Sequence, residues 1–317
     1  MDILAKERKV RELESKILEL GNDEIISKLR QEIENYKQEA MTNLTAWDRV
    51  LLARHQHRPV ASEYIAYLCD SFMEFHGDRN FSDDKSIIGG IGIVNGTVVT
   101  IIAQQKGKTV EENLIRNFAM PHPEGYRKAL RLMKQAEKFR RPIITLIDTP
   151  GAYPGLGAEE RGQGEAIARN LLEMSSFTVP IIAIVIGEGG SGGALALGVA
   201  NTVMMLENAI YSILTPEGYA TILWKDASLA SKAAEVMKVT SYDLEELGII
   251  DRIIKEPLGG AHFNKMETFK NTKLAIVNEL QDLKQFTGIE LRDRRIEKYR
   301  NYGFFQRFNY DNLKGVK

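Results

Sequence analysis

Two glycine-rich loops, each directly following a short apolar segment, are the parts of this sequence best suited to chemistry. The first segment reads PIITLIDTPGAYPG at residues 142–155, and the second reads PIIAIVIGEGGSGG at residues 180–193. Glycine lets the backbone approach a ligand closely, and backbone N–H groups aimed at one point stabilise a developing oxyanion. The pattern predicts an enzyme that holds negative charge with main-chain amides rather than with a reactive side chain.

The elements around the loops must bring them together. Each apolar run is short, rich in β-branched residues and opened by a proline, Pro142 or Pro180, as is typical of a buried parallel strand. A helical pattern follows each loop. We therefore expect two adjacent parallel strands whose glycine loops lie at the same edge of one sheet.

Composition excludes several classes of protein. The chain has 317 residues, 44% hydrophobic and 27% charged, which is typical of a soluble globular protein, and its net charge of −1 gives no support to nucleic-acid binding. Cys69 is the only cysteine, so neither an internal disulfide nor a CxxC zinc site can form. The start lacks a signal peptide and no apolar run reaches the ~18 residues of a membrane span. We expect a cytoplasmic protein without membrane contact.

The N-terminal residues 1–40 are polar, charged and helical in pattern. Two narrow apolar stripes, separated by the turn Gly21-Asn22-Asp23, predict a helical hairpin. Either the body of the chain covers these stripes, or the hairpin is an arm that grips another subunit. The stripes consist of Leu13, Ile17 and Leu20, and of Ile25, Leu29, Ile33 and Tyr36.

Residues 41–290 alternate strand and helix patterns, which favours one α/β core, and residues 291–317 form a charged, then aromatic, tail. The turn Asn95-Gly96 between two apolar runs predicts a β-hairpin. Thr215-Pro216 predicts a helix start. The other expected elements are helices around 62–75, 123–140, 164–175, 192–199 and 240–247, a loop over 106–122, and strands over 202–206, 209–214 and 249–254.

Two nucleotide-binding motifs are present only in part. Residues 187–192 fit GxGxxG after a strand, but Gly198 leaves too short a helix behind them. Residues 148–151 fit a GTPase DxxG motif, and residues 106–109 resemble the end of a P-loop. Ile102, however, stands where a P-loop requires glycine. We expect neither dinucleotide binding nor nucleotide hydrolysis.

A serine nucleophile is the more serious alternative. Residues 189–193 fit the GxSxG elbow with Ser191 at its centre. In an elbow the serine follows its strand almost at once, whereas residues 187–190 intervene here, and His262 is the only histidine after Ser191. A serine peptidase using Ser191 stays open as the alternative function, and a non-catalytic scaffold subunit as a second. The five histidines are scattered, so we expect ordinary core or surface residues and no metal in this chain.

Over residues 45–262 the sequence resembles the α subunit family of the bacterial-type, multi-subunit acetyl-CoA carboxylase carboxyltransferase, and the hairpin at 2–39 fits the same family. The matching stretches keep the family's order. They are GDRNFSDDKSIIGGI (77–91), QKGK (105–108), RNFAMPHPEGYRKALRLM (116–133), PIITLIDTPGAYPGLGAEERGQGEAIARNL (142–171), VIGEGGSGGALALGV (185–199), TPEG (215–218) and EPLGGAH (256–262).

The resemblance implies an α/β crotonase-like fold, of the Clp protease and crotonase class, built from repeated ββα units with helical extensions. It implies transfer of a carboxyl group from carboxybiotin to acetyl-CoA, giving malonyl-CoA, the first committed step of fatty acid synthesis. Biotin would be attached to a separate biotin carboxyl carrier protein, and ATP would be used only by a separate biotin carboxylase. A β subunit with a zinc ribbon would supply most of the acyl-CoA site, in an assembly expected to be α2β2.

The resemblance also assigns site residues. Gly189 and Gly190 would donate backbone N–H groups, at the start of the short helix, to the biotin oxygen. The opposite wall of the substrate site would be formed by Gly151, Ala152 and Tyr153, with Pro154, Gly155 and Ser191 also in contact with substrate. Valine at Gly190 should then block carboxybiotin while leaving the protein folded.

Overall fold

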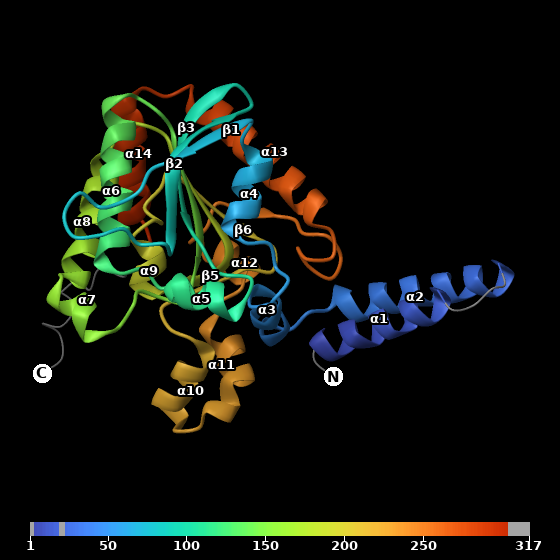
Figure 1. The fold of residues 1–317 in the computed structure, drawn as a ribbon. Helices are drawn as coiled ribbons and strands as arrows, with labels where there is room; N and C mark the ends of the chain where they lie inside the picture. Colours follow the sequence, from blue (N-terminus) through green and yellow to red (C-terminus); the bar gives the residue numbers. More distant parts are fainter. Residues whose placement is uncertain (1–2, 19–22, 304–317) are drawn as a thin grey trace, which may run out of the picture.

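A computed structural model describes residues 3–18 and 23–303, and within them the chain folds around one eight-stranded sheet (Figure 1). The strand order is β1-β2-β3-β4-β5-β6-β8, and β7 also pairs with β5. The first three strands are antiparallel and all later pairings are parallel. The strands are β1 (Ser71–Glu74), β2 (Ile87–Val94), β3 (Thr97–Gln104), β4 (Ile143–Thr149), β5 (Ile181–Gly190), β6 (Thr202–Leu206), β7 (Ile210–Ser212) and β8 (Arg252–Ile254).

Helices cover both faces of the sheet, as parallel strands that are apolar throughout require. α6, α8 and α14 lie on one side and α4 and α13 on the other (Figure 1). Every residue of β4 and β5 is buried. The helices are α1 (Ile3–Leu18), α2 (Asp23–Thr42), α3 (Ala46–Ala53), α4 (Ala61–Leu68), α5 (Val110–Ile115), η1 (Asn117–Ala119), α6 (Pro123–Lys138), α7 (Leu156–Glu160), α8 (Gln163–Ser176), α9 (Ser191–Leu195), α10 (Pro216–Trp224), η2 (Ala227–Leu229), α11 (Ala230–Met237), α12 (Ser241–Glu246), α13 (Lys265–Leu283) and α14 (Gly288–Arg300).

Most elements lie where the pattern predicted them, including the Asn95-Gly96 hairpin, both parallel strands and the Thr215-capped helix α10. Two expectations were wrong. The helix expected over 62–75 ends at Leu68, and residues 71–74 instead form the edge strand β1. The loop expected over 106–122 contains the helix α5, capped by the Thr109 side chain.

The predicted division between residues 290 and 291 falls inside helix α14. Leu291 and Arg295 of this helix are buried. The Arg295 guanidinium donates hydrogen bonds to the carbonyl oxygens of Met174, Phe177 and Val179, at 2.7–3.0 Å. Helix α14 is therefore built into the core. The expected aromatic tail over residues 304–317 lies outside the described residues.

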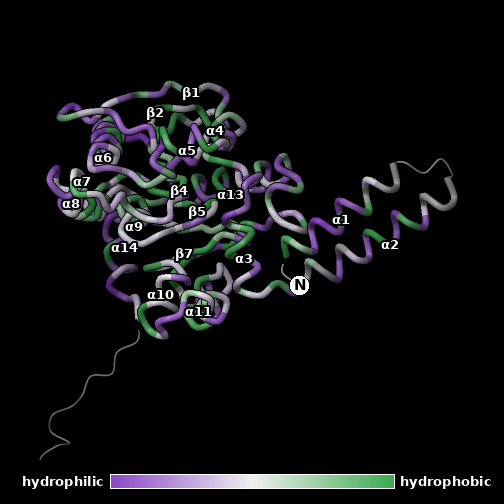
Figure 2. The backbone as a smooth tube through the Cα atoms, turned by 60° about the horizontal axis from the view of Figure 1, so that its bottom comes forward, coloured by the Kyte–Doolittle hydropathy of each residue, from purple (hydrophilic) through white to green (hydrophobic). Residues whose placement is uncertain are grey.

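α1 and α2 form the predicted helical hairpin, and it projects from the body as an arm (Figures 1 and 2). Part of the arm packs on the body, because α1 and α2 share one apolar cluster with Leu52 of α3 and Phe263. The Ile3 N–H also donates to Asp48 at 2.9 Å. The arm members of that cluster include Leu13, Leu29, Ile33 and Tyr36 from the predicted stripes, while Leu20 and the side chains of Ile17 and Ile25 lie outside the description.

A buried ion pair joins the turn after α3 to the segment after β8. Arg58 and Glu256 side chains are 3% and 0% exposed, with Nη2 and Oε1 2.5 Å apart. Arg58 Nε also donates to the Ile186 carbonyl of β5 at 2.8 Å, and Glu256 accepts the N–H groups of Asn208 and Ala261. Both buried charges are therefore paired and also hydrogen-bonded to the backbone, as burial of a charged group requires.

We expect Glu256→Gln to lower the free energy of unfolding by about 3–5 kcal/mol, because it leaves the Arg58 charge buried without its partner. The matched control is Glu165→Gln, which breaks the exposed Arg169–Glu165 pair of α8. This control should cost less than about 0.5 kcal/mol. Urea unfolding of both variants measures the difference, and equal losses would show that the buried pair is dispensable.

Candidate active site

The two glycine loops meet at the carboxyl ends of β4 and β5, as predicted. A Cβ atom placed on Gly190 would lie 2.1 Å from the Pro150 carbonyl oxygen, and one on Gly193 would lie 2.6 Å from the Ala152 nitrogen. No side chain fits into such gaps, so the two backbones pack directly against each other. Gln104 of β3 joins the loops further, donating to the Gly193 carbonyl at 2.7 Å and accepting the Asp148 N–H at 3.1 Å.

Gly189 and Gly190 are the last two residues of strand β5, and Gly190 is also the N-cap residue of the short helix α9. Gly189 pairs with Thr149 of β4 and with Tyr211 of β7, and Gly190 pairs with Ser212 of β7. Successive N–H groups of an extended strand point in opposite directions. The first N–H groups of α9, which have no partner within the helix, belong to Ser191 and the residues after it.

Ser191 is the residue at which the chain turns from β5 into α9, and its φ of 50° is rare for a residue with a side chain. The serine therefore follows its strand at once, and our expectation that residues 187–190 separate the two was wrong. A triad is nevertheless missing within the described part of the chain. The His262 ring stacks on His55 beside Glu7, and no histidine lines the cavity that Ser191 borders.

The residues expected on the opposite wall divide into two groups. Gly151 and Ala152 lie against the second loop, as the close approaches of Gly190 and Gly193 show. Tyr153 instead donates its N–H to the Pro121 carbonyl at 3.1 Å, and its ring packs on His122 with centroids 4.2 Å apart. Pro154 is exposed, and Gly155 serves as the N-cap of α7.

A network of charged side chains lies beside the glycine loops at the carboxyl ends of β4 and β5. Lys106 Nζ lies 2.7 Å from Asp148 Oδ1 and 3.0 Å from Glu188 Oε1. Arg54 Nε donates to the other Glu188 oxygen at 2.7 Å, and its Nη1 donates to Glu217 of α10 at the same distance. The carboxyl ends of β4 and β5 are thereby tied to the segment after β3, to the end of α3 and to α10.

These charges stay in place at neutral pH. Burial opposes ionisation of Glu188, but the neighbouring Lys106 and Arg54 outweigh it and lower the pKa of Glu188 to about 2. The same carboxylates raise the pKa of Lys106 despite its burial. Neither group is therefore suited to exchange protons with a substrate near pH 7.

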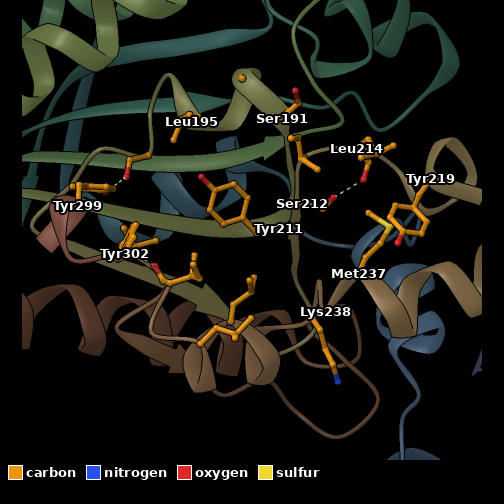
Figure 3. Close-up of a pocket in the computed structure, with 17 residues that line it drawn as sticks. Ser191, Leu195, Tyr211, Ser212, Leu214, Tyr219, Met237, Lys238, Tyr299 and Tyr302 are labelled. Atoms are coloured by element: carbon orange, nitrogen blue, oxygen red, sulfur yellow. Dashed lines mark hydrogen bonds between the residues drawn. The ribbon is translucent and has the colours of Figure 1, made fainter. Parts of the chain in front are cut away.

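A cavity of about 730 Å³ adjoins the turn at Ser191 and Gly192 (Figure 3). Figure 3 shows the Tyr211 ring between Ser191 on one side and Tyr299 and Tyr302 on the other. The lining of the cavity is mostly apolar and comes from α9, β7, α12 and the last turn of α14. Burial raises the pKa of the Tyr211 phenol to about 12. The volume is typical of a small-molecule site.

The cavity could not be predicted from the sequence, because its walls come from segments that are far apart along the chain. Tyr299 of α14 donates its hydroxyl to the Gly198 carbonyl at 2.7 Å and accepts the Ala200 N–H at 2.9 Å. Tyr302 likewise donates to the Ile249 carbonyl at 3.0 Å. Two tyrosines close together at the end of a helical pattern were the available signal, with Tyr299 in the last turn of α14 and Tyr302 just beyond its C-cap.

Comparison with known proteins gives a consistent result. The family model described as acetyl co-enzyme A carboxylase carboxyltransferase-like matches residues 2–303. The acetyl-coenzyme A carboxylase carboxyl transferase subunit alpha of Staphylococcus haemolyticus is 59% identical over 280 residues, covering 88% of this chain and 89% of that protein. The Staphylococcus aureus protein of the same name is 58% identical over 282 residues, covering 89% and 90%.

Solved structures agree on the fold. Transcarboxylase 12S superposes with a TM-score of 0.57 at 21% identity, over 70% of this chain and 41% of that one. A Pseudomonas malonate decarboxylase hetero-dimer superposes with a TM-score of 0.55 at 16% identity, over 73% and 89%. The predicted α/β crotonase-like fold is confirmed. Among the helices of the described residues, none is both long and apolar enough to cross a membrane.

Because the two loops are in close contact, substituting different glycines should change the stability of the protein by different amounts. We expect Gly190→Ala to destabilise the protein by about 1–3 kcal/mol or more, since its methyl group would strike the Pro150 carbonyl. Valine here would meet the same contact and lower stability as well, so whether that variant stays folded enough to assemble stays a prediction. Gly192→Ala is the control, because its methyl group would lie 3.7 Å from Ile167. It should be neutral or stabilising by up to about 1 kcal/mol in the helix, and thermal unfolding measures both.

Proposed function

This chain belongs to the acetyl co-enzyme A carboxylase carboxyltransferase family. We therefore propose that it transfers the carboxyl group of carboxybiotin to acetyl-CoA, forming malonyl-CoA. Biotin is carried by a separate carrier protein, and ATP is consumed only by a separate biotin carboxylase. The observation that carries the proposal is the backbone-to-backbone contact of the two glycine loops, Pro150–Ala152 against Gly190 and Gly193. Between those two glycines, Ser191 and Gly192 border a cavity of ligand size.

The chain's own residues stabilise charge. Carboxybiotin supplies the carboxyl group, and its ureido oxygen becomes negative as that group leaves. Removing one N–H donor to such an oxygen costs ~2.7–4 kcal/mol in known enzymes. We assign these donors to the second loop, with Gly189 and Gly190 as the resemblance implies and with Ser191 and Gly192 as the first free N–H groups beyond the turn.

The remaining residues exclude water and hold the loops. The apolar lining of the cavity suits the hydrocarbon part of the biotin ring system, and we assign Gly151 and Ala152 to the opposite wall of the substrate site as the resemblance implies. The Lys106, Asp148 and Glu188 network holds the strand ends together. Its members Glu188, with a lowered pKa, and Lys106, with a raised pKa, offer no proton exchange near pH 7. Positioning and backbone electrostatics therefore account for the catalytic role of this chain.

The other half of the reaction needs a second polypeptide. With Cys69 as its only cysteine, the chain has no zinc ribbon of the kind expected in the β subunit. We propose that a β subunit supplies most of the thioester site, that the assembly is α2β2, and that it works in the cytoplasm with the carrier protein and biotin carboxylase.

Reconstitution tests the function. The purified chain alone should have negligible activity, whereas the chain mixed with a β subunit should decarboxylate malonyl-CoA in the presence of free biotin. Ser191→Ala should keep most of that activity, because the hydroxyl is not a nucleophile in this scheme. A single chain that turns over malonyl-CoA at the rate of the complex would refute the proposal. The serine hydrolase would be favoured if Ser191→Ala were inactive and if a fluorophosphonate probe labelled the wild type but not this variant.

The arm generates a separate prediction. Its paired helices are held by a narrow apolar seam and project from the body, as an assembly arm would. We expect deletion of residues 2–39 to weaken association with the β subunit more than it lowers the unfolding temperature of the body. Light scattering of the mixed subunits measures association. An unchanged complex with the truncated chain would show that the arm does not contribute to assembly.

A further inference from the structure

Three side chains from distant segments meet where the arm joins the body. Glu7 comes from α1, His55 follows α3, and His262 lies in the turn before α13. Their side chains are only 4%, 9% and 1% exposed. Glu7 Oε2 lies 3.4 Å from His55 Nε2 and 3.3 Å from His262 Nε2, and the two rings stack with centroids 3.9 Å apart.

The polar atoms of this cluster are poorly satisfied by the protein itself. Glu7 Oε2 and both ring nitrogens of His262 are buried without a hydrogen-bond partner. Leaving a buried polar atom unpaired costs about 1–3 kcal/mol, and more for a charged group. Glu7 Oε2 and His262 Nε2 face each other at 3.3 Å, and together they point to a missing partner that both share.

The spacing of these atoms fits a metal ion of the zinc class. Zinc binds imidazole nitrogen at about 2.0–2.1 Å and carboxylate oxygen at about 2.0–2.2 Å, so two ligands at the tetrahedral angle lie about 3.3–3.5 Å apart. Both measured separations from Glu7 Oε2 fall in this range. Two imidazoles and one carboxylate are also a donor set that zinc and similar transition metals prefer.

We propose that Glu7, His55 and His262 bind one divalent cation of the zinc class, which pins the arm to the body. Arg11 donates to the other Glu7 oxygen, Oε1, at 2.5 Å. This contact leaves Oε2 as the ligand atom and fixes its direction, as groups around metal ligands commonly do. The site lies outside the glycine loops, so it is independent of the proposed carboxyl transfer.

One contact has to change when the ion binds. His55 Nδ1 accepts the His57 N–H at 3.2 Å, which places the proton of a neutral ring on Nε2. A neutral ring that binds the ion through Nε2 carries its proton on Nδ1 instead, so Nδ1 can no longer accept the His57 N–H and that contact is lost. Affinity should therefore fall as the pH is lowered, because protons and metal compete for the same nitrogens.

Calorimetric titration of the metal-free full chain with Zn²⁺ tests the site. We expect one tight equivalent in the wild type. Binding in Glu7→Gln and in His262→Gln should be weaker by more than the roughly 10- to 100-fold that loss of a residue supporting a metal ligand costs. His57→Gln is the matched control, because its ring neighbours His55 but contributes no ligand. Zn²⁺ should also slow tryptic cleavage of the arm in the wild type and in His57→Gln, and not in the two cluster variants.

X-ray absorption at the zinc edge of the loaded wild type needs no variant and so guards against misfolding of the substituted chains. Two imidazoles and an oxygen ligand at about 2.0–2.2 Å are expected. The absence of a tight equivalent, equal affinity in Glu7→Gln and His57→Gln, or an absorption spectrum without imidazole would each overturn the proposal.

Discussion

The direct packing of one backbone against another, Pro150–Ala152 against Gly190 and Gly193, is the constraint on which this structure depends. Glycine at two positions makes the contact possible, and the parallel pairing of β4 with β5 places both loops at one edge. A β-bulge between Ile147 and Thr149 shifts the register there. The Asp148 side chain, next to that shift, accepts the Glu188 N–H at 2.9 Å. Local backbone geometry and strand order thus act together.

Glycine loops lack side chains that could hold them, so other residues must do it. The Gln104 amide joins both loops, and Lys106 pairs with the carboxylates of Asp148 and Glu188 behind them. Buried ion pairs are weak sources of net stability, but they fix geometry because each charge must find its partner. Arg58 and Glu256 use the same device to attach the segment after β8 to the centre of β5.

Much of the fold could be predicted because local signals and the final packing agree. The Asn95-Gly96 turn, the Thr215 cap and the two apolar strands are each determined by neighbouring residues. Strand β1 could not be found this way. Its residues 71–74 are mostly exposed and owe their extended form to pairing with β2.

The features of the site likewise divide into those set by local sequence and those set by contacts between distant residues. Contact between the loops follows from their repeated pattern, whereas the cavity and the cluster of Glu7, His55 and His262 are built from residues far apart in the chain. The extension of β5 through Gly190 could not be foreseen either, because glycine has a low strand propensity and only the flanking β4 and β7 impose it.

The attachment of the arm has a consequence for how the chain is made. Glu7 and Ile3 are translated long before their partners near His262 and Phe263. Contacts between such remote positions form slowly, because a long loop must close before they stabilise anything. The arm is therefore translated before the body and is among the last elements to dock on it. Its apolar residues stay available to other chains throughout synthesis, and the order of translation itself favours early contact with a partner.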